Sequence, residues 1–298
     1  MTSEAAGVLV IDKPGGWTSH DVVAKTRGLT RIRQIGHAGT LDPMATGVLV
    51  LCIGKATRLL EYLTGQPKSY RAEITLGTAT ETYDAEGEVS ATRPVPPLTT
   101  GEIDQALMPF RGDILQVPPA YSAIKRDGVA SYKRARRGED VQLEPRPVTI
   151  YSLDLLAFDG VVLRIDVTCS AGTYIRSLAH DLGKALGCGA HLSGLRRSAV
   201  ASFTLAQAVT LVDLTAAGEQ WTQFLLPSDS AVAHLPAVVV PDDNVARLLH
   251  GGSVPGKEIP AEGPVRAYDS DGRLLAIVSY QPDQQAWKPL KVLSSPQD

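Results

Sequence analysis

The alternation of hydrophobic and polar positions along the chain predicts a protein built from both strands and helices. Short apolar runs and strictly alternating stretches are typical of buried and half-buried strands, and they occur at 7–11, 48–53, 69–76, 148–158 and 161–169. The turn signal Asp159-Gly160 predicts that the last two of these segments form a hairpin.

Apolar spacing and capping residues predict helices at 20–29, 57–63, 100–107 and 174–186. Thr18 or Ser19 is expected to cap the first helix, with Asp21 in its favourable first turn, and Thr100 is expected to cap the third. The apolar stripe of the last helix comprises Ile175, Leu178, Ala179, Leu182 and Leu186.

The character of the chain changes after about residue 230. Strand-like runs at 238–240, 265–268 and 274–278 are separated by tight turns and by one short helix near 244–249. We therefore expect a small β-rich second domain in this part of the chain.

The composition is that of an ordinary soluble globular protein. The chain has 298 residues, of which 44% are hydrophobic and 20% charged, and its net charge of −3 gives no overall basic field that would indicate nucleic acid. Cys52, Cys169 and Cys188 are isolated from one another, which argues against a disulfide framework or zinc motif and fits a reducing cytoplasm. The N-terminus lacks a signal-peptide pattern, and no apolar run is long enough to span a membrane.

Two segments are nevertheless locally basic. The segment 25–33 contains four basic residues and no acid, and it is either a solvated helix face or a patch that faces phosphates. The segment 125–137 contains six basic residues and one acid, and Tyr121 and Tyr132 lie in and beside it. Basic side chains interleaved with aromatic ones suit single-stranded or loop nucleic acid.

The stretch 36–43, Gly-His-Ala-Gly-Thr-Leu-Asp-Pro, is the strongest candidate for chemistry. Its two glycines allow positive φ and close approach to a ligand, and Pro43 stiffens the backbone that presents Asp42. A rigid loop at the mouth of a buried strand is a common place for functional residues. The alternative is a tight turn in which Asp42 bonds only its own backbone.

Two further side chains allow two interpretations each. Tyr70 begins the strand at 69–76 and is either a core aromatic or a platform on which a base stacks. Arg176 lies off the apolar stripe in the first turn of its helix, where a positive charge is mildly unfavourable. It is either an ordinary surface arginine or the partner of a specific anion.

Taken in order, these motifs resemble those of the bacterial tRNA pseudouridine-55 synthases, the TruB family. The matching blocks are 12–14 with 17–19, 36–43 with 45–47, 70–72, 80–87, and 172–178 with 181–183, and further matches occur at 118–125 and 195–197. Ala38 and Glu81 depart from the residues that many relatives carry, Thr and Asp. The resemblance covers roughly residues 7–230.

The resemblance implies an α+β fold with a mixed, mainly antiparallel central sheet flanked by helices. It also implies a catalytic domain at 1–230, with a mobile basic loop at about 120–147 that closes over the RNA, and a PUA-like RNA-binding domain at 231–298. From 235 onward the chain has six basic and eight acidic residues, a net charge of −2, which places the RNA affinity of that domain in question.

The implied function is conversion of uridine 55 in the T-loop of tRNA to pseudouridine, after the target base is flipped out. The carboxylate of Asp42 would act either as a nucleophile or as the base that removes the C2′ proton. By the resemblance, Arg176 pairs with Asp42, and Tyr174 assists proton transfer or base positioning. Tyr70 would stack on the target uracil, and His37 would fill the space that the base vacates. Pocket lining and RNA contact are implied for Asp84, Lys13, Lys125 and Leu195.

The implied enzyme needs no metal or other cofactor, which fits the lack of nucleotide, metal and flavin signatures. It would be a cytoplasmic monomer that binds the T-arm of tRNA and requires no membrane and no protein partner. The alternatives are a non-catalytic tRNA-folding chaperone on the same scaffold and a synthase that acts on other RNA, alone or with a guide. A hydrolase based on His37 and Asp42 is disfavoured, because no serine or cysteine lies in a nucleophile-elbow context.

Overall fold

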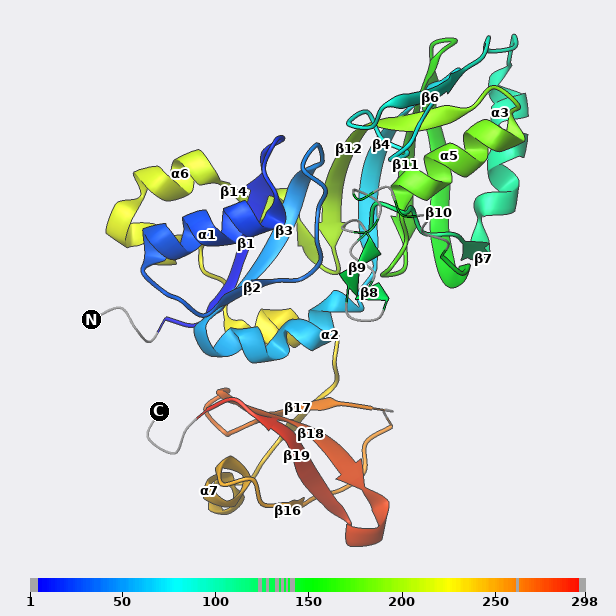
Figure 1. The fold of residues 1–298 in the computed structure, drawn as a ribbon. Helices are drawn as coiled ribbons and strands as arrows, with labels where there is room; N and C mark the ends of the chain where they lie inside the picture. The colour runs from blue at the N-terminus through cyan, green and yellow to red at the C-terminus, as the bar shows by residue number, and fades with distance from the viewer. Residues whose placement is uncertain are drawn as a thin grey trace.

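The computed structural model describes residues 5–122, 125–126, 129–131, 134, 137, 139, 143–260 and 263–294. Within them the chain forms a ten-stranded sheet, a separate five-stranded sheet and two pairs of short strands (Figure 1). The pairs are β5 (Thr78–Thr80) with β6 (Val89–Thr92), and β8 (Lys125–Arg126) with β9 (Val129–Ala130).

The ten-stranded sheet runs in the order β14-β1-β3-β12-β4-β11-β10-β7, with β2 beside β3 and β13 beside β12. β12 is parallel to β3 and β14 is parallel to β1, whereas the other neighbours are antiparallel. The prediction of a mixed, mainly antiparallel sheet is therefore confirmed. Its strands are β1 (Gly7–Lys13), β2 (Ile35–His37), β3 (Thr46–Ile53), β4 (Lys68–Leu76), β7 (Gly112–Gln116), β10 (Arg146–Phe158), β11 (Val162–Cys169), β12 (Ala190–Val200), β13 (Phe203–Thr204) and β14 (Val209–Thr210).

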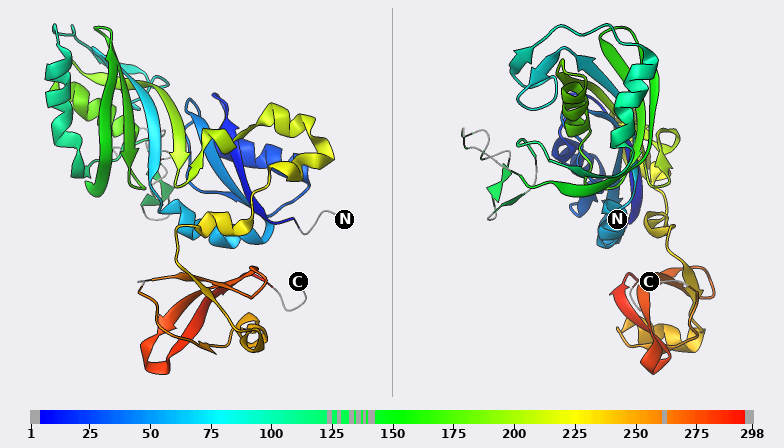
Figure 2. Two further views of the ribbon diagram at one scale, coloured as in Figure 1. Left: turned by 180° about the vertical axis from the view of Figure 1, so that it is seen from behind. Right: turned by 90° about the vertical axis from the view of Figure 1, so that its right-hand side faces the viewer.

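Helices lie along this sheet toward both of its ends. α1 (Ser19–Thr30) and α6 (Leu211–Ala216) lie at the β1 end, and α3 (Thr100–Leu107) and α5 (Ile175–Ala185) lie at the β10 end (Figure 1). The view from behind in Figure 2 shows β4, β10 and β11 without a covering helix. The exposed ion pairs Arg71–Asp166 and Arg164–Glu73 join β4 to β11 there, which explains how this face remains compatible with water.

Local capping explains where two helices begin. The Thr18 hydroxyl accepts a hydrogen bond from the Asp21 backbone, and the Asp21 carboxylate accepts one from the Thr18 backbone, so Thr18 is the cap of α1. The cap of α3 is Thr99 and not the predicted Thr100, because Glu102 stands three residues after Thr99 and completes the same reciprocal pair.

One further prediction needs correction, and one strand was missed. The helix predicted at 57–63 begins as a 3-10 helix at Gly54–Leu59, and only α2 (Leu60–Thr64) is α-helical. The central strand β12 was not predicted. Its register shifts beside Gly194 and Ala199 break the alternation that marks a strand, and its start lies in a glycine-rich segment.

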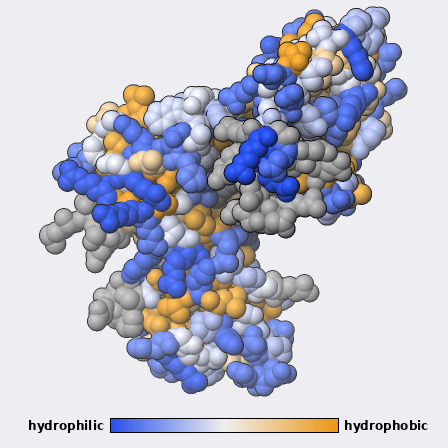
Figure 3. Space-filling view, in the orientation of Figure 1, coloured by the Kyte–Doolittle hydropathy of each residue, from blue (hydrophilic) through white to orange (hydrophobic). Residues whose placement is uncertain are grey.

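The exposed basic residues of segment 25–33 lie on the second half of α1 and just after it: Lys25, Arg27, Arg31 and Arg33. Arg27 donates a hydrogen bond to the Ile35 carbonyl oxygen at 2.9 Å, which ties the helix to β2. Hydrophilic surface covers this part of the molecule in Figure 3. None of the helices in the described part of the chain is long and apolar enough to cross a membrane.

The five-stranded sheet has the order β15-β17-β18-β19-β16 and packs α7 (Asp242–Leu249) against β18, so the β-rich character expected after residue 230 is confirmed. It lies below α2 in Figure 1. Ile277 of β18 is fully buried in one apolar cluster with Val50 of the larger sheet. The strands are β15 (Ala237–Val239), β16 (Val254–Pro255), β17 (Val265–Tyr268), β18 (Leu274–Gln281) and β19 (Ala286–Val292), of which β16 and β19 were not predicted.

Candidate active site

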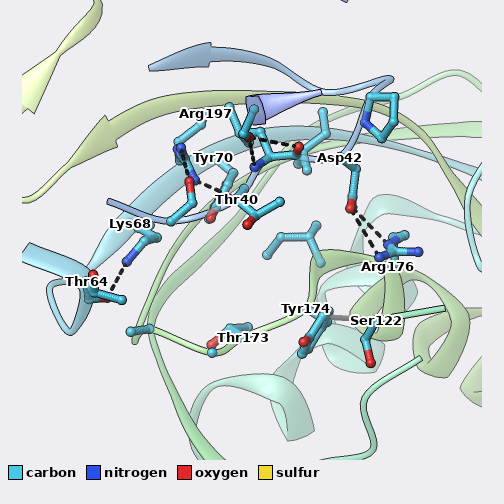
Figure 4. Close-up of a pocket in the computed structure, with 18 of the residues that line it drawn as sticks. Thr40, Asp42, Thr64, Lys68, Tyr70, Ser122, Thr173, Tyr174, Arg176 and Arg197 are labelled. Atoms are coloured by element: carbon cyan, nitrogen blue, oxygen red, sulfur yellow. Dashed lines mark hydrogen bonds and ion pairs between the residues drawn. The ribbon is translucent and has the colours of Figure 1, made fainter. Parts of the chain in front are cut away.

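A cavity of about 670 Å³ lies against the larger sheet where β12 and β4 are neighbours. The start of α1, loop 39–43, the end of α2, the start of β4 and loop 170–174 with the start of α5 form its walls. Figure 4 shows that Asp42 and Arg176 face each other at one side of this cavity, whereas Lys68 lies at the opposite side.

The loop that presents Asp42 is held from two neighbouring elements. The Ser19 hydroxyl, at the start of α1, accepts a hydrogen bond from the Leu41 backbone at 2.8 Å and donates one to the Leu41 carbonyl oxygen at 3.2 Å. The fully buried ammonium of Lys13 donates to the carbonyl oxygens of Pro14, Trp17 and Pro43. These bonds fix the residues on both sides of Asp42, so the carboxylate has little freedom to move.

A third support comes from the buried guanidinium of Arg197 on β12. It donates to the carbonyl oxygens of Val48 at 2.7 Å, Gly39 at 3.1 Å and Thr40 at 3.4 Å. Gly47 lies opposite Arg197 in the parallel pairing of β3 with β12. Because three carbonyl oxygens depend on one buried side chain, Arg197 joins the Asp42 loop to the centre of the sheet.

Asp42 forms an ion pair with Arg176 at one side of the cavity. Nε of Arg176 lies 3.0 Å from Oδ2 of Asp42, and Nη2 of Arg176 donates to Oδ1 at 3.3 Å. The Arg176 side chain is 7% exposed and that of Asp42 is 33% exposed, so solvent reaches the carboxylate of the pair but hardly reaches the guanidinium. Burial raises the pKa of the Asp42 carboxyl above its ordinary value, and the charge of Arg176 opposes that rise.

Arg176 is bound from behind by a second carboxylate. Its Nη1 donates to Oδ2 of Asp84 at 3.3 Å, and its remaining bonds go to the carbonyl oxygens of Thr82 and Tyr121. Asp84 is itself 3% exposed and accepts a hydrogen bond from the Glu86 backbone. Arg176 therefore lies between two acids, of which only Asp42 reaches the cavity.

The start of α5 is fixed by a side chain from β7. Tyr174 precedes the first residue of α5, and both of its backbone groups bond to the Gln116 amide, at 2.8 and 3.0 Å. This arrangement holds the Tyr174 ring in the cavity wall and fixes the turn from which Arg176 projects. Burial raises the pKa of the Tyr174 phenol above its usual range.

The predicted site residues fall into two groups. The structure brings Asp42, Arg176, Tyr174, Tyr70 and Leu195 together in the lining of one cavity. Three others do not line it: Asp84 lies behind Arg176, Lys13 behind the Asp42 loop and His37 on β2.

Within the described residues, Nδ1 of His37 is buried and has no hydrogen-bond partner, and the His37 ring lies edge-on to the cavity residue His20, with 5.9 Å between ring centroids. Burial lowers the pKa of His37. The backbone of Lys125 pairs with β9, and its side chain lies outside the described residues, as does most of the predicted basic loop.

Several residues that shape the site were not among the sequence candidates: Ser19, Lys68, Gln116 and Arg197. Gln116 and Lys68 stand at ends of strands and carry no local signal of their roles. The described part of the chain contains no group of three His, Cys, Asp or Glu side chains that could hold a metal ion.

The chain matches known proteins over nearly its whole length. A family model described as "TruB family pseudouridylate synthase (N terminal domain)" matches residues 27–175, and one described as "tRNA pseudouridylate synthase B C-terminal domain" matches residues 176–239. A Dehalococcoides mccartyi protein (strain BAV1) named tRNA pseudouridine synthase B is 43% identical over 288 residues, 96% of both chains. A protein of the same name from Pseudomonas syringae pv. syringae is 47% identical over 279 residues, 91% of this chain and 90% of the relative.

Solved structures give the same picture at greater distance. A chain in "Structure of H/ACA RNP bound to a substrate RNA containing 2'-deoxyuridine" has a TM-score of 0.76 and 29% identity, covering 98% of this chain and 86% of that chain. A chain in "Crystal Structure of a Cbf5-Nop10-Gar1 Complex" has a TM-score of 0.76 and 30% identity with the same coverage. The fold is therefore shared over both sheets.

Proposed function

The chain belongs to the TruB family of pseudouridylate synthases, and from that premise we propose that it converts uridine 55 in the T-loop of tRNA to pseudouridine. The observation that carries this proposal is the Asp42–Arg176 pair at the wall of a 670 Å³ cavity, because the reaction needs one fixed carboxylate at the sugar. The reaction breaks the C1′–N1 bond of the uridine, turns the uracil over and joins C1′ to C5.

Asp42 is the catalytic carboxylate in this proposal. It acts on the sugar either as a nucleophile at C1′ or as the base that removes the C2′ proton, and both routes require its ionised form. Arg176 supports that form, since a cation 3.0 Å away favours the charged state of a buried acid. Asp84 keeps Arg176 in place on the other side of its guanidinium, as a positioning residue.

The target base must leave the folded T-loop to reach Asp42, and the cavity offers it aromatic and apolar walls. Tyr70, 8% exposed on β4, is proposed to stack on the uracil, a contact worth about 1–3 kcal/mol. Tyr174 and Leu195 would enclose the ring, and Tyr174 would assist base positioning or proton transfer. We expect His37 to take up the space that the base vacates.

The rest of the RNA is proposed to contact the basic segment 120–147, including Lys125, and a PUA-like domain formed by residues 231–298. Lys13 was expected to contact RNA. Its three bonds to carbonyl oxygens support a different role, that of holding the Asp42 loop. We further propose a cytoplasmic monomer that works on tRNA without a protein partner.

Tritium release tests the proposal. tRNA transcript labelled at uracil C5 loses its label only when C5 becomes bonded to C1′. We expect release by the wild-type protein, no release by Asp42→Asn, and tRNA dissociation constants within about threefold of each other, since the carboxylate acts on the bound nucleotide. Binding by both proteins without release by either would sink the assignment and favour a tRNA-folding chaperone on the same scaffold.

A further inference from the structure

The cavity has a second cationic wall that the Asp42–Arg176 pair does not explain. Lys68, at the start of β4, is 7% exposed, and Arg197, on β12, is fully buried. Both line the cavity. In Figure 4 they lie on the side away from Arg176. The hydroxyl of Tyr70 interacts with Arg197.

Within the described residues, the hydrogen-bond acceptors of these two cations are neutral: backbone carbonyl oxygens and, for Arg197, the Tyr70 phenol. The Lys68 ammonium donates to the carbonyl oxygens of Thr64 at 3.1 Å and Gln66 at 2.8 Å, and Arg197 donates to three further carbonyls. Neither forms an ion pair with a carboxylate of the described chain. Burial, with a smaller contribution from the nearby charge of Arg197, lowers the pKa of Lys68 to about 8.

Capping of α2 does not account for this arrangement. A cation at a helix C-terminus is favourable, and Lys68 does bond the last carbonyl of α2. A buried ammonium without an opposite charge is nevertheless costly, and water or a neutral donor satisfies a carbonyl equally well. Uncompensated charge in a cavity wall is typical of a site where negative charge forms during a reaction.

The proposed reaction places negative charge in this region. In one route an Asp42 oxygen bonds to C1′ as N1 takes the electron pair of the C1′–N1 bond. In the other, Asp42 takes the C2′ proton, C1′ and C2′ become doubly bonded, and N1 again takes its pair. Either way the detached uracil carries one negative charge. C5 then bonds to C1′, while the Asp42–C1′ bond breaks in the first route or Asp42 returns its proton to C2′ in the second. C5 loses its proton and N1 gains one, so no oxidant or reductant is needed.

We propose that Lys68, with Arg197 behind it, stabilises the uracil anion formed when the C1′–N1 bond breaks. This inference rests on the proposed function. It divides the cavity into two parts: Asp42 and Arg176 act on the sugar, and Lys68 and Arg197 act on the departing ring that lies against Tyr70. A catalytic role for Lys68 then follows from its position beside that ring.

Single-turnover kinetics with saturating enzyme test the proposal, using tRNA transcript and the variants Lys68→Met and Lys68→Arg. Lys184→Met, at an exposed position on α5, controls for the loss of one positive charge. We expect Lys68→Met to slow tritium release about 100-fold, with a tRNA dissociation constant within about threefold of wild type. Lys68→Arg should recover part of the rate, and Lys184→Met should match wild type.

A better leaving group separates this role from a structural one. In transcript with 5-fluorouridine at the target position the ring bears negative charge more easily, and its consumption can be followed by nuclease digestion and chromatography. The deficit of Lys68→Met should then shrink by about tenfold, because less stabilisation is required. A structural tie would leave the deficit the same with both bases and would overturn the proposal.

Two other results would also overturn it. One is an unchanged rate in Lys68→Met. The other is a loss confined to binding, with the salt dependence of the dissociation constant reduced by about one charge, which marks a backbone-phosphate contact. Failure of the wild-type protein to release tritium would instead refute the proposed function itself, so the two failures are distinguishable.

Discussion

Gly47 lies directly opposite Arg197 in the parallel pairing of β3 with β12, and a Cβ atom at Gly47 would come within 2.2 Å of the Arg197 carbonyl oxygen. Gly47 also has a φ of +99°, a conformation that other residues adopt only under strain. The contact between these two backbones is what allows Arg197 to reach the carbonyls of the Asp42 loop. A side chain here would therefore damage the fold and the site together.

Gly47→Ala is expected to lower the free energy of unfolding by roughly 3 kcal/mol or more, through steric conflict and backbone strain. Urea denaturation measures the change. Gly65→Ala is the control, because Gly65 has a φ of −76° and nothing near its missing Cβ, and a result within about 0.5 kcal/mol of wild type is expected there. Equal stability of the two variants would contradict the prediction.

Asp84→Asn is expected to move the acid limb of the pH–rate profile to lower pH. The negative charge of Asp84 raises the pKa of Asp42, in addition to the effect of burial. Removing that charge lowers the pKa of Asp42, so its ionised, active form persists further into acid. Single-turnover rates between pH 4 and 8 would show the shift. Asp166→Asn removes a carboxylate from an exposed ion pair on the far face of the sheet. This variant should not shift the acid limb of the pH–rate profile.

Ser19→Ala is expected to cost about 1–3 kcal/mol of stability, because the buried backbone N–H of Leu41 loses its acceptor. The rate should fall as well, about tenfold, since Leu41 is the neighbour of Asp42 and small displacements of a reacting group are costly. Thermal melting and tritium release measure the two effects. Ser270→Ala, at an exposed hydroxyl in the turn between β17 and β18, should change neither. A Ser19→Ala protein with wild-type stability and wild-type activity would contradict the role given to this hydroxyl.

Lys291→Met tests how the five-stranded sheet is attached. The Lys291 ammonium on β19 donates to the Arg58 carbonyl oxygen at 2.8 Å, pairs with Glu61 and lies over the Tyr62 ring. Loss of these contacts should lower the free energy of unfolding, measured by urea denaturation, by about 1 kcal/mol. Lys288→Met, an exposed lysine on the same strand, should have no effect, and an equal loss in both would show that the contacts with α2 are not responsible.

Local sequence signals were sufficient to predict the helices and strands that are stabilised by contacts between residues close in sequence. The reciprocal cap at Thr18 and Asp21, the alternation of β4 and β11 and the apolar stripe of α5 all act within a few residues, and each predicted element is present. The mixed sheet and the identity of Asp42 and Arg176 as partners came from the family resemblance. These two residues are 134 positions apart, and no periodicity indicates which distant side chains meet.

The parts that sequence did not reveal depend on tertiary contacts. Arg197 resembles a surface arginine just after a glycine-rich segment. It is nevertheless one of the most buried side chains of the protein, and it bonds two carbonyl oxygens of the Asp42 loop and one of β3. Asp84 was expected to line the pocket. Its place behind Arg176 follows from the way its turn packs against β12, through the bridge between Asp84 and Leu192. Burial of this kind carries no signature in composition or spacing.

The position of β12 between β3 and β4 has a consequence for how the protein is made. The ribosome synthesises β1, β3 and β4 first. β12, which lies between β3 and β4 in the sheet, is at 190–200 and leaves the exit tunnel after them. Until then β3 and β4 each lack their pairing with β12, and Asp42 lacks the support of Arg197. A nascent chain therefore acquires its catalytic centre in a single late step, and truncation before residue 190 yields an aggregation-prone product without activity.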